Sequence, residues 1–194
     1  MKLLHLDSSI LGENSASRTI SAAVVAQLKK GDPSIDVTYR DLVAEPLPHL
    51  TVDTWSKLDN GEDVAQFLDS DVVVIGAGFY NFSIPSQLKA WIDRIAVAGK
   101  TFRYTANGPE GLAGNKRVIV AVSRGGLYSA GMPAAAFEHV ESYLRGVFGF
   151  LGVTDLEIVV AEGLQIGPEL REKAMQGALQ IVTDLRPATQ LRAA

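Results

Sequence analysis

Three hydroxyl side chains, those of Ser9, Ser15 and Ser17, precede an apolar periodicity that predicts a helix. A helix start presents unpaired backbone N–H groups and a partial positive charge. The three hydroxyls and this helix start could therefore bind a phosphate together. The segment lacks the glycine pattern of dinucleotide-binding loops and the Gly-Lys-Ser/Thr ending of triphosphate-binding loops. This favours a monophosphate that is bound but not transferred. The alternative is that Asn14 or Ser15 only caps the helix. Arg18 could face the phosphate, but a side chain of this type is more often solvated.

An aromatic cluster, formed by Phe79, Tyr80 and Phe82, surrounds Asn81 and follows the stretch Gly76-Ala77-Gly78. Small residues let a flat ligand approach the backbone, and the rings offer it an apolar wall. The Asn81 amide both donates and accepts hydrogen bonds, which matches the edge of an isoalloxazine with its carbonyls and ring nitrogens. The alternative is that these rings fill the core between a strand and the next helix.

A third polar loop contains Ser123, Arg124 and the paired glycines Gly125 and Gly126. Consecutive glycines expose consecutive backbone N–H groups, which can stabilise negative charge that develops on a reduced flavin. A flexible turn is the alternative if this loop is taken alone. The three segments together favour a ligand.

Five short apolar runs predict strands, and a segment with helical periodicity follows each of them. The strands are predicted at 3–6, 35–40, 72–75, 118–122 and 156–160, and the helices at 20–28, 51–68, 88–95, 137–147 and 169–185. This alternation predicts one α/β domain over residues 1–194, with a parallel sheet and helices on both faces. Because ligands of such sheets bind beyond the carboxyl ends of the strands, the three polar loops should meet there.

Two features interrupt the regular alternation. Gly99 is expected to close the helix at 88–95. The segment 101–112 alternates and then reaches a Gly/Pro turn, which predicts a small hairpin or flap. Phe102 or Tyr104 could cover an aromatic substrate, or one of them packs against the domain.

Composition excludes several classes of protein. The absence of cysteine excludes disulfides, thiolate catalysis and iron–sulfur ligation. A net charge of −4 without a basic stripe argues against nucleic-acid binding. The apolar runs are too short for a membrane span, and no signal sequence develops, so we expect a soluble, cytoplasmic protein. His5, His49 and His139 are too scattered for a metal site or a general base, and His5 is expected in or near the core.

The sequence resembles the FMN-dependent NADH:quinone oxidoreductase/azoreductase family of bacterial flavodoxin-like enzymes, over nearly its whole length. The residues that carry the resemblance are Ser8-Ser9-Ile10-Leu11, Ser15-Ala16-Ser17, Tyr80-Asn81-Phe82, Pro85-Ser86-Gln87-Leu88-Lys89, Trp91-Ile92-Asp93, Gly99, Thr101-Phe102, Tyr104-Thr105, Gly108-Pro109, Gly111-Leu112 and Ser123-Arg124-Gly125-Gly126. The Tyr-Asn-Phe block with its trailing Pro-x-Gln-Leu-Lys is the most specific part. One departure is Gly78-Phe79, where family members often have Pro-Met, and this puts the substrate preference in doubt more than the cofactor.

The resemblance implies a flavodoxin-like, doubly wound, five-stranded parallel sheet of order 2-1-3-4-5 that binds FMN. It implies phosphate contacts from Ser9, Ser15, Ala16 and Ser17. The isoalloxazine would be held by two sets of residues, one on each side: Phe79, Tyr80, Asn81 and Phe82, and Ser123, Arg124, Gly125 and Gly126.

The implied activity is transfer of hydride from NADH or NADPH, through FMN, to quinones or aromatic azo compounds in a ping-pong order. The flavin would perform the chemistry, so no side chain is nominated as a catalytic acid or nucleophile. The family also implies a homodimer with the flavin sites at its interface, for which Trp55, Trp91 and the 148–150 region could supply apolar surface. An electron-carrier flavodoxin and a flavin-free binding module are the rival functions, since a fold alone does not fix an activity.

Overall fold

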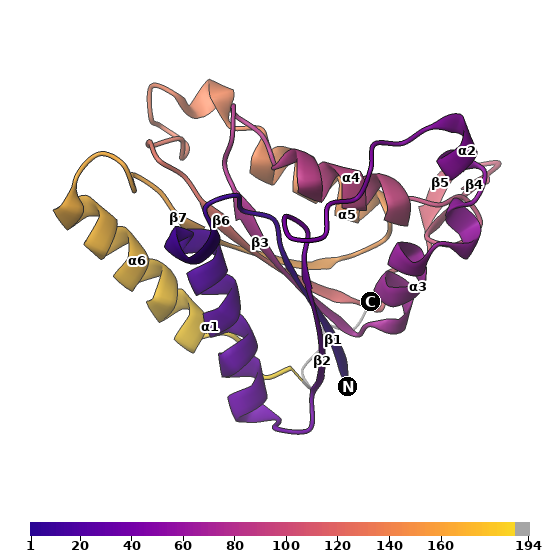
Figure 1. Ribbon diagram of the computed structural model, residues 1–194, viewed down its shortest axis with the longest axis horizontal. Coiled ribbons are helices and arrows are strands. Elements are labelled where there is room, and N and C mark those ends of the chain that lie inside the picture. Colours follow the sequence, from indigo (N-terminus) through magenta and orange to yellow (C-terminus); the bar gives the residue numbers. More distant parts are fainter. Residues whose placement is uncertain (189–194) are drawn as a thin grey trace.

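Five parallel strands form the centre of the molecule, as Figure 1 shows for the computed structural model, which describes residues 1–188. In chain order they are β1 (Lys2–Asp7), β2 (Asp36–Asp41), β3 (Val72–Gly78), β6 (Arg117–Ser123) and β7 (Asp155–Ala161). Their order in the sheet is β2-β1-β3-β6-β7. Counted along the chain without the separate hairpin, this is the predicted order 2-1-3-4-5, with every neighbouring pair parallel.

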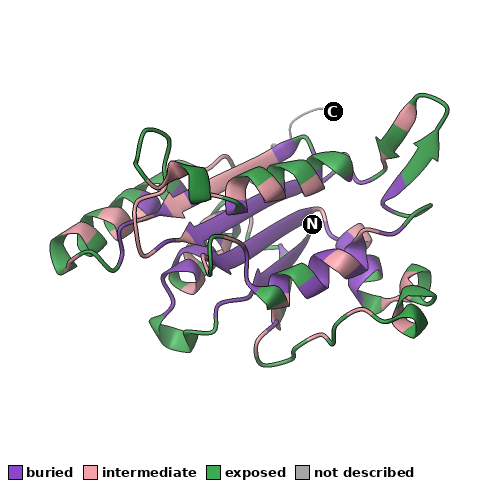
Figure 2. Cartoon of the chain, turned by 90° about the horizontal axis from the view of Figure 1, so that it is seen from above, coloured by how far each residue is buried: buried purple, intermediate pink, exposed green. Residues whose placement is uncertain are grey.

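Alternate strand residues pack into two different hydrophobic clusters, because successive side chains of a strand point to opposite faces. One cluster joins Val73 and Ile75 of β3 to the helices α4 (Ser86–Ile95) and α5 (Val140–Phe150). The other joins Val72 and Val74 to α1 (Ala16–Gly31) and α6 (Pro168–Thr183). Figure 1 shows the two helix pairs on either side of the sheet, and Figure 2 shows their outer faces exposed while the strands between them are buried.

The amphipathic pattern of the fourth predicted helix is confirmed. Leu88, Trp91, Ile92 and Ile95 of α4 are all buried, at the spacing that puts them on one face. The helix ends at Ile95, however, and Gly99 lies in the turn that follows, where its φ of +79° suits glycine. Gly99 therefore shapes the exit from the helix and does not close it.

One predicted helix is divided into shorter pieces, and another begins later than expected. The segment 51–68 forms α2 (Val52–Trp55), a 3-10 turn η2 (Leu58–Asn60) and α3 (Glu62–Asp69). The break occurs because Gly61 adopts an extended conformation, with φ −72° and ψ 146°, before α3. Likewise Phe137 does not belong to α5 and ends a separate 3-10 turn, η3 (Ala135–Phe137). A further 3-10 turn, η1 (Gly12–Asn14), precedes α1.

The predicted hairpin is present as β4 (Phe102–Thr105) and β5 (Gly108–Gly111), which pair antiparallel. It packs beside the 151–152 turn that leads into β7, since the Ala113 N–H donates to the Leu151 carbonyl at 2.8 Å. The hairpin therefore lies at the amino-terminal edge of the sheet, far from the polar loops of its own chain. Phe102 is buried against Phe150, whereas the Tyr104 ring is 75% exposed. The suggestion that this segment covers the chain's own site is thus wrong, and the alternative that one ring packs against the domain is confirmed.

Gly111 provides a test of how closely the hairpin is packed. A Cβ added there would lie 2.1 Å from the Gly152 backbone nitrogen. Because the clash is with backbone, no side-chain movement can remove it. We expect Gly111→Ala to lower the free energy of unfolding by about 1–3 kcal/mol. Gly177→Ala, within α6 with no atom within 4 Å of the added Cβ, should instead stabilise by up to about 1 kcal/mol. Urea unfolding of both variants measures this, and equal effects would contradict the packing described here.

Candidate functional site

Four loops meet at the carboxyl edge of the sheet, after β1, β3, β6 and β7. They enclose a cavity of about 500 Å³, which we call the ring pocket. Its lining residues are Ile10, Phe79, Tyr80, Asn81, Phe82, Gly125, Gly126, Tyr128 and Gln165. A smaller cavity of about 70 Å³, the inner pocket, adjoins it through Phe79, Tyr80, Gly125 and Gln165 and reaches Asn14 and Ala16 at the start of α1. The three loops that the sequence singled out are therefore brought together.

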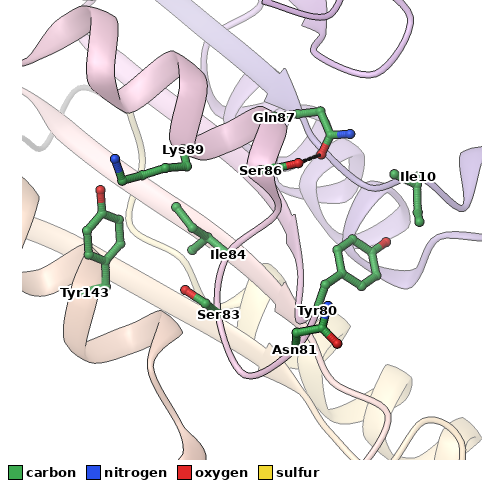
Figure 3. A pocket seen from close by; sticks show the side chains of 9 residues that line it. All are labelled: Ile10, Tyr80, Asn81, Ser83, Ile84, Ser86, Gln87, Lys89 and Tyr143. Atoms are coloured by element: carbon green, nitrogen blue, oxygen red, sulfur yellow. Dashed lines mark hydrogen bonds between the residues drawn. The ribbon is translucent and has the colours of Figure 1, made fainter. Parts of the chain in front are cut away.

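A third and larger cavity, of about 670 Å³, lies on the other side of Tyr80 and Asn81 along α4. Figure 3 shows the Lys89 and Tyr143 side chains at the end of this helix pocket opposite Tyr80. Burial raises the pKa of the Tyr143 hydroxyl to about 12, with a smaller contribution from Asp93. Tyr143 is thus neutral and can donate a hydrogen bond at any physiological pH.

The first loop combines a capped helix start with free backbone donors. Ser15 is the N-cap of α1, and its hydroxyl accepts from the Arg18 N–H at 3.3 Å and lies 3.1 Å from the Ser17 hydroxyl. The capping role considered from the sequence is therefore confirmed. The N–H groups of Ala16 and Ser17 have no hydrogen-bond acceptor within residues 1–188. The first turn of α1 can still bind an anion, because these two donors point out of its amino end.

Ser9 and Arg18 are both engaged within the protein. The Ser9 hydroxyl is hydrogen-bonded to the Tyr80 hydroxyl at 2.8 Å, which links the first loop to the second. The Arg18 guanidinium donates to both carboxylate oxygens of Asp41, at 2.7 and 2.8 Å, and to the Ser9 carbonyl at 2.9 Å. This contact lowers the pKa of Asp41 and raises that of Arg18. The expectation of a solvated Arg18 is wrong, because the side chain fixes the first loop against β2.

The second loop is a tight turn with an unusual backbone. Tyr80 and Ser83 exchange two backbone hydrogen bonds of 3.0 Å, so Asn81 and Phe82 are its central residues. Their φ angles are +47° and +72°. A two-residue turn of this kind needs positive φ at both positions, which asparagine tolerates and a bulky aromatic residue rarely adopts. Strain of this sort costs about 1–3 kcal/mol and is most often found at functional sites.

The aromatic residues of the second loop have different surroundings. Phe79 is half-buried against the core, 4.5 Å from the Tyr128 ring and 5.7 Å from the Arg124 guanidinium. Tyr80 lines all three pockets, and Phe82 is 43% exposed at the mouth of the ring pocket. The alternative that the rings fill the core thus holds in part for Phe79.

The two glycines of the second loop have different surroundings. A Cβ on Gly76 would meet the Asp7 carboxylate at 2.2 Å, and one on Gly78 would meet the Tyr80 ring at 2.8 Å. The protein's own side chains therefore occupy the space where these Cβ atoms would lie. Gly78 nevertheless lines the inner pocket, so the expectation that a ligand approaches the backbone of this loop stays a prediction there.

The third loop separates a buried charge from free backbone donors. The Arg124 side chain is fully buried and lies 3.0, 2.7 and 3.6 Å from carboxylate oxygens of Glu138, Glu141 and Glu162. Its Nη2 atom donates to Glu138 and Glu141, whereas Nε and Nη1 are buried without a hydrogen-bond partner among the described residues. The N–H groups of Gly125 and Gly126 donate no hydrogen bond to any residue of the described range. These are the groups that an anionic or carbonyl-bearing ligand could use.

Glu162 fixes the segment that follows the paired glycines. One of its carboxylate oxygens accepts from the N–H groups of Tyr128 and Ser129, at 2.9 and 3.1 Å. Desolvation raises the pKa of this carboxyl, but the two backbone donors and the Arg124 charge outweigh it, so the net pKa is lowered. Glu162 is therefore ionised near neutral pH and holds the start of that segment in place.

Sequence reasoning missed the loop after β7. Leu164, Gln165 and Arg171 line the inner pocket, and the Gln165 side chain lies where a Cβ on Gly125 would be. Only the loops after the first, third and fourth strands were considered. The signal available was the fifth strand itself, since its carboxyl end must reach the same edge of a parallel sheet.

Other predicted residues lie away from the site. His5 is buried, with Nε2 3.1 Å from the Ser21 hydroxyl, as expected for a histidine in the core. Within residues 1–188 no group of histidine and acidic side chains could hold a metal ion, and no helix could cross a membrane. Among the proposed interface residues, Trp91 and Phe148 are core, while Trp55 and Phe150 are 68% and 36% exposed.

Comparison with known proteins identifies the family. A family model described as "Flavodoxin-like fold" matches residues 1–185. The "FMN-dependent NADH:quinone oxidoreductase 2" of Bradyrhizobium diazoefficiens is 58% identical over 202 residues, covering 97% of this chain and 100% of the relative. The azoreductase crystal structure from Bacillus anthracis str. Sterne has a TM-score of 0.83 at 32% identity, covering 95% of this chain and 100% of that one.

A second solved structure, an FMN-dependent NADH-azoreductase from Bacillus anthracis str. Ames Ancestor in complex with FMN, has the same TM-score of 0.83 at 26% identity. It covers 94% of this chain and 96% of its own. The near-complete coverage, the sequence identity and the order of the strands all support the same family. The chain therefore belongs to the flavodoxin-like family of FMN-dependent NADH:quinone oxidoreductases and azoreductases.

Proposed function

We propose that this chain binds FMN and uses NADH or NADPH to reduce quinones and aromatic azo compounds. The observation that carries the proposal is the set of free backbone donors beside two adjoining cavities: Ala16 and Ser17 beside the inner pocket, and Gly125 and Gly126 beside the ring pocket. A phosphate and a flat heterocycle on one molecule would satisfy both pairs. The relatives named for FMN and quinones support the same assignment.

The residues that we assign to FMN have the chemistry that its phosphate and ring require. Ser9, Ser15, Ala16 and Ser17 would hold the phosphate through hydroxyl and backbone donors at the start of α1. Phe79, Tyr80, Asn81 and Phe82 would contact one side of the ring system, and Ser123, Arg124, Gly125 and Gly126 the other. Because the Arg124 side chain is fully buried and forms ion pairs with three glutamates, we assign its contact with the ligand to its backbone.

When bound, FMN supplies a two-electron carrier with which the nicotinamide donor and then the acceptor react at one place, in a ping-pong order. The protein's part is to bind, orient and stabilise charge. The Gly125 and Gly126 N–H groups stabilise negative charge on the ring side of the site. No Asp, Glu, His or Lys is among the residues that line the ring pocket, so we assign proton supply to water and name no catalytic acid.

Phe79 bears on substrate preference. It replaces the methionine that relatives often have and lies between the Tyr128 ring and the Arg124 guanidinium. A stiff ring held in this way keeps a fixed shape at the back of the ring pocket. We infer that the site favours flat acceptors over bulky, non-planar ones.

We also propose that the protein acts as a homodimer. The proposal is supported by the exposed aromatic side chains of Trp55, Tyr104 and Phe150, which a partner chain could cover. Analytical ultracentrifugation should give twice the 20.8 kDa chain mass. A monomer at micromolar concentration would remove this part of the proposal.

The visible spectrum of the purified protein tests the cofactor and the reaction together. We expect a yellow protein that bleaches on anaerobic addition of NADH and recovers its colour with benzoquinone. A colourless protein that does not take up FMN would favour a flavin-free binding module. A yellow protein that neither NADH nor NADPH bleaches would favour an electron carrier.

Two substitutions at Asn81 separate its amide from its backbone. Asn81→Ala removes the amide and disfavours the positive φ, whereas Asn81→Gly removes the amide and keeps that conformation accessible. If the amide binds the ring, both variants should weaken FMN by roughly tenfold, the worth of one or two hydrogen bonds. Fluorescence titration of the apoprotein with FMN measures this.

Asn107→Ala, at the tip of the distant hairpin, is the matched control and should leave FMN affinity unchanged. If Asn81→Gly retains the wild-type affinity, the amide has no role. In that case any loss in Asn81→Ala comes from the backbone alone.

A further inference from the structure

The segment 127–139, which we call the strap, connects the paired glycines to α5. Figure 1 shows it rising beyond the carboxyl ends of β3 and β6, beside the loop that follows β3. Its last residue, His139, donates its N–H to the Phe82 carbonyl at 3.1 Å. The strap therefore contacts the strained turn of the second loop directly.

Both ends of the strap are fixed by buried or half-buried carboxylates. Glu162 accepts from the N–H groups of Tyr128 and Ser129 at the start. At the end, one Glu138 oxygen accepts from the Val140 N–H at 2.8 Å and from the Arg124 guanidinium at 3.0 Å. Because Arg124 is fully buried, these contacts fix the position of the strap relative to the turn.

Phe137 lies at the contact between the strap and the turn. Its ring stacks on that of Phe82, with centroids 5.0 Å apart and planes 29° apart. Phe82 also meets the Tyr128 ring at 6.3 Å. Stacked aromatic pairs attract each other beyond the area they bury. The Phe82 ring, carried by a strained two-residue turn, is therefore held between two rings of the strap.

Phe82 lines the ring pocket and Phe137 does not. Phe82 is 43% exposed and Phe137 51% exposed, so together they offer an apolar surface that continues outward from the pocket. A ligand with one ring can occupy the pocket alone. A ligand with a second fused ring can also bury part of this surface, which the hydrophobic effect favours.

We propose that Phe137 is a positioning residue, which fixes the Phe82 ring as a wall of the ring pocket and thereby makes the protein prefer acceptors with two or more fused rings over single-ring acceptors. This inference rests on the proposed function. Phe137 acts through Phe82, so its removal should change the binding of large acceptors. Because Phe82 also belongs to the proposed FMN site, the FMN content of each variant is measured and the rates are expressed per bound FMN.

The test compares Phe137→Ala and Phe137→Tyr with the wild type. The readout is kcat/KM for 1,4-naphthoquinone divided by that for 1,4-benzoquinone. In Phe137→Ala this ratio should fall about three- to tenfold, through a higher KM for naphthoquinone with an unchanged kcat. Phe137→Tyr keeps the stack and should restore the wild-type ratio.

Two further measurements do not depend on turnover. The affinity of 1,4-naphthoquinone for the oxidised holoenzyme, followed by the perturbation of flavin absorbance, should fall by the same factor in Phe137→Ala. The near-ultraviolet circular dichroism of the apoprotein should change in the same variant, because the Tyr128–Phe82–Phe137 rings are rearranged. Met132→Ala, an exposed strap residue with no ring contact to Phe82, is the control and should change neither.

An unchanged ratio in Phe137→Ala would overturn the inference, and so would an equal loss of both activities or a change only in oligomeric state. Wild-type protein that retains FMN and reduces both quinones shows that the proposed function stands in those cases. Wild-type protein that does not retain FMN removes the proposed function and the acceptor preference with it. The circular dichroism then still tells whether Phe137 positions Phe82.

Discussion

Backbone N–H groups need acceptors, and at the carboxyl edge of this sheet those of Ala16, Ser17, Gly125 and Gly126 are among the groups that lack one within the described residues. Ala16 and Ser17 lie at the start of α1, and Gly125 and Gly126 follow β6. A buried strand satisfies its polar groups through its neighbours, but a strand end or a helix start cannot. The parallel arrangement places these ends at one edge of the sheet. The fold therefore leaves unpaired donors there, which a ligand can satisfy.

Ion pairs made by two arginines hold the loops at this edge of the sheet in place. Arg18 binds Asp41 and the Ser9 carbonyl, which draws the first loop toward β2. Arg124 binds Glu138, Glu141 and Glu162, which fixes both ends of the strap. Removing one partner of such a buried pair is costly, because the remaining charge stays desolvated. These arginines therefore fix the loops that surround the site.

Much of the fold could be predicted from the sequence, because its signals are strong and local. β3 is a run of β-branched residues buried on both faces, and α4 carries four apolar residues at helical spacing. Helix ends were less predictable, since Gly61 and Gly99 act through their backbone angles and not through any pattern of hydrophobicity.

The site was predictable in outline but not in its contacts. Residue type alone could not show that Arg124 and Arg18 turn toward carboxylates distant in sequence, or that the Tyr80 ring fills the space above Gly78. Nor did any local motif indicate Gln165 or Phe137. Their importance comes from tertiary contacts with Gly125 and Phe82, which only the folded chain brings together.

The central claim is that the four free N–H groups bind one ligand with a phosphate at one end and a ring at the other. Amide chemical shifts of the ¹⁵N-labelled apoprotein, followed during titration with FMN and separately with riboflavin, test it most directly. With FMN, the signals of Ala16, Ser17, Gly125 and Gly126 should all shift and saturate together at one equivalent. With riboflavin, which lacks the phosphate, only the two glycine signals should shift strongly. Saturable binding of FMN that leaves these four amides unperturbed would contradict the account.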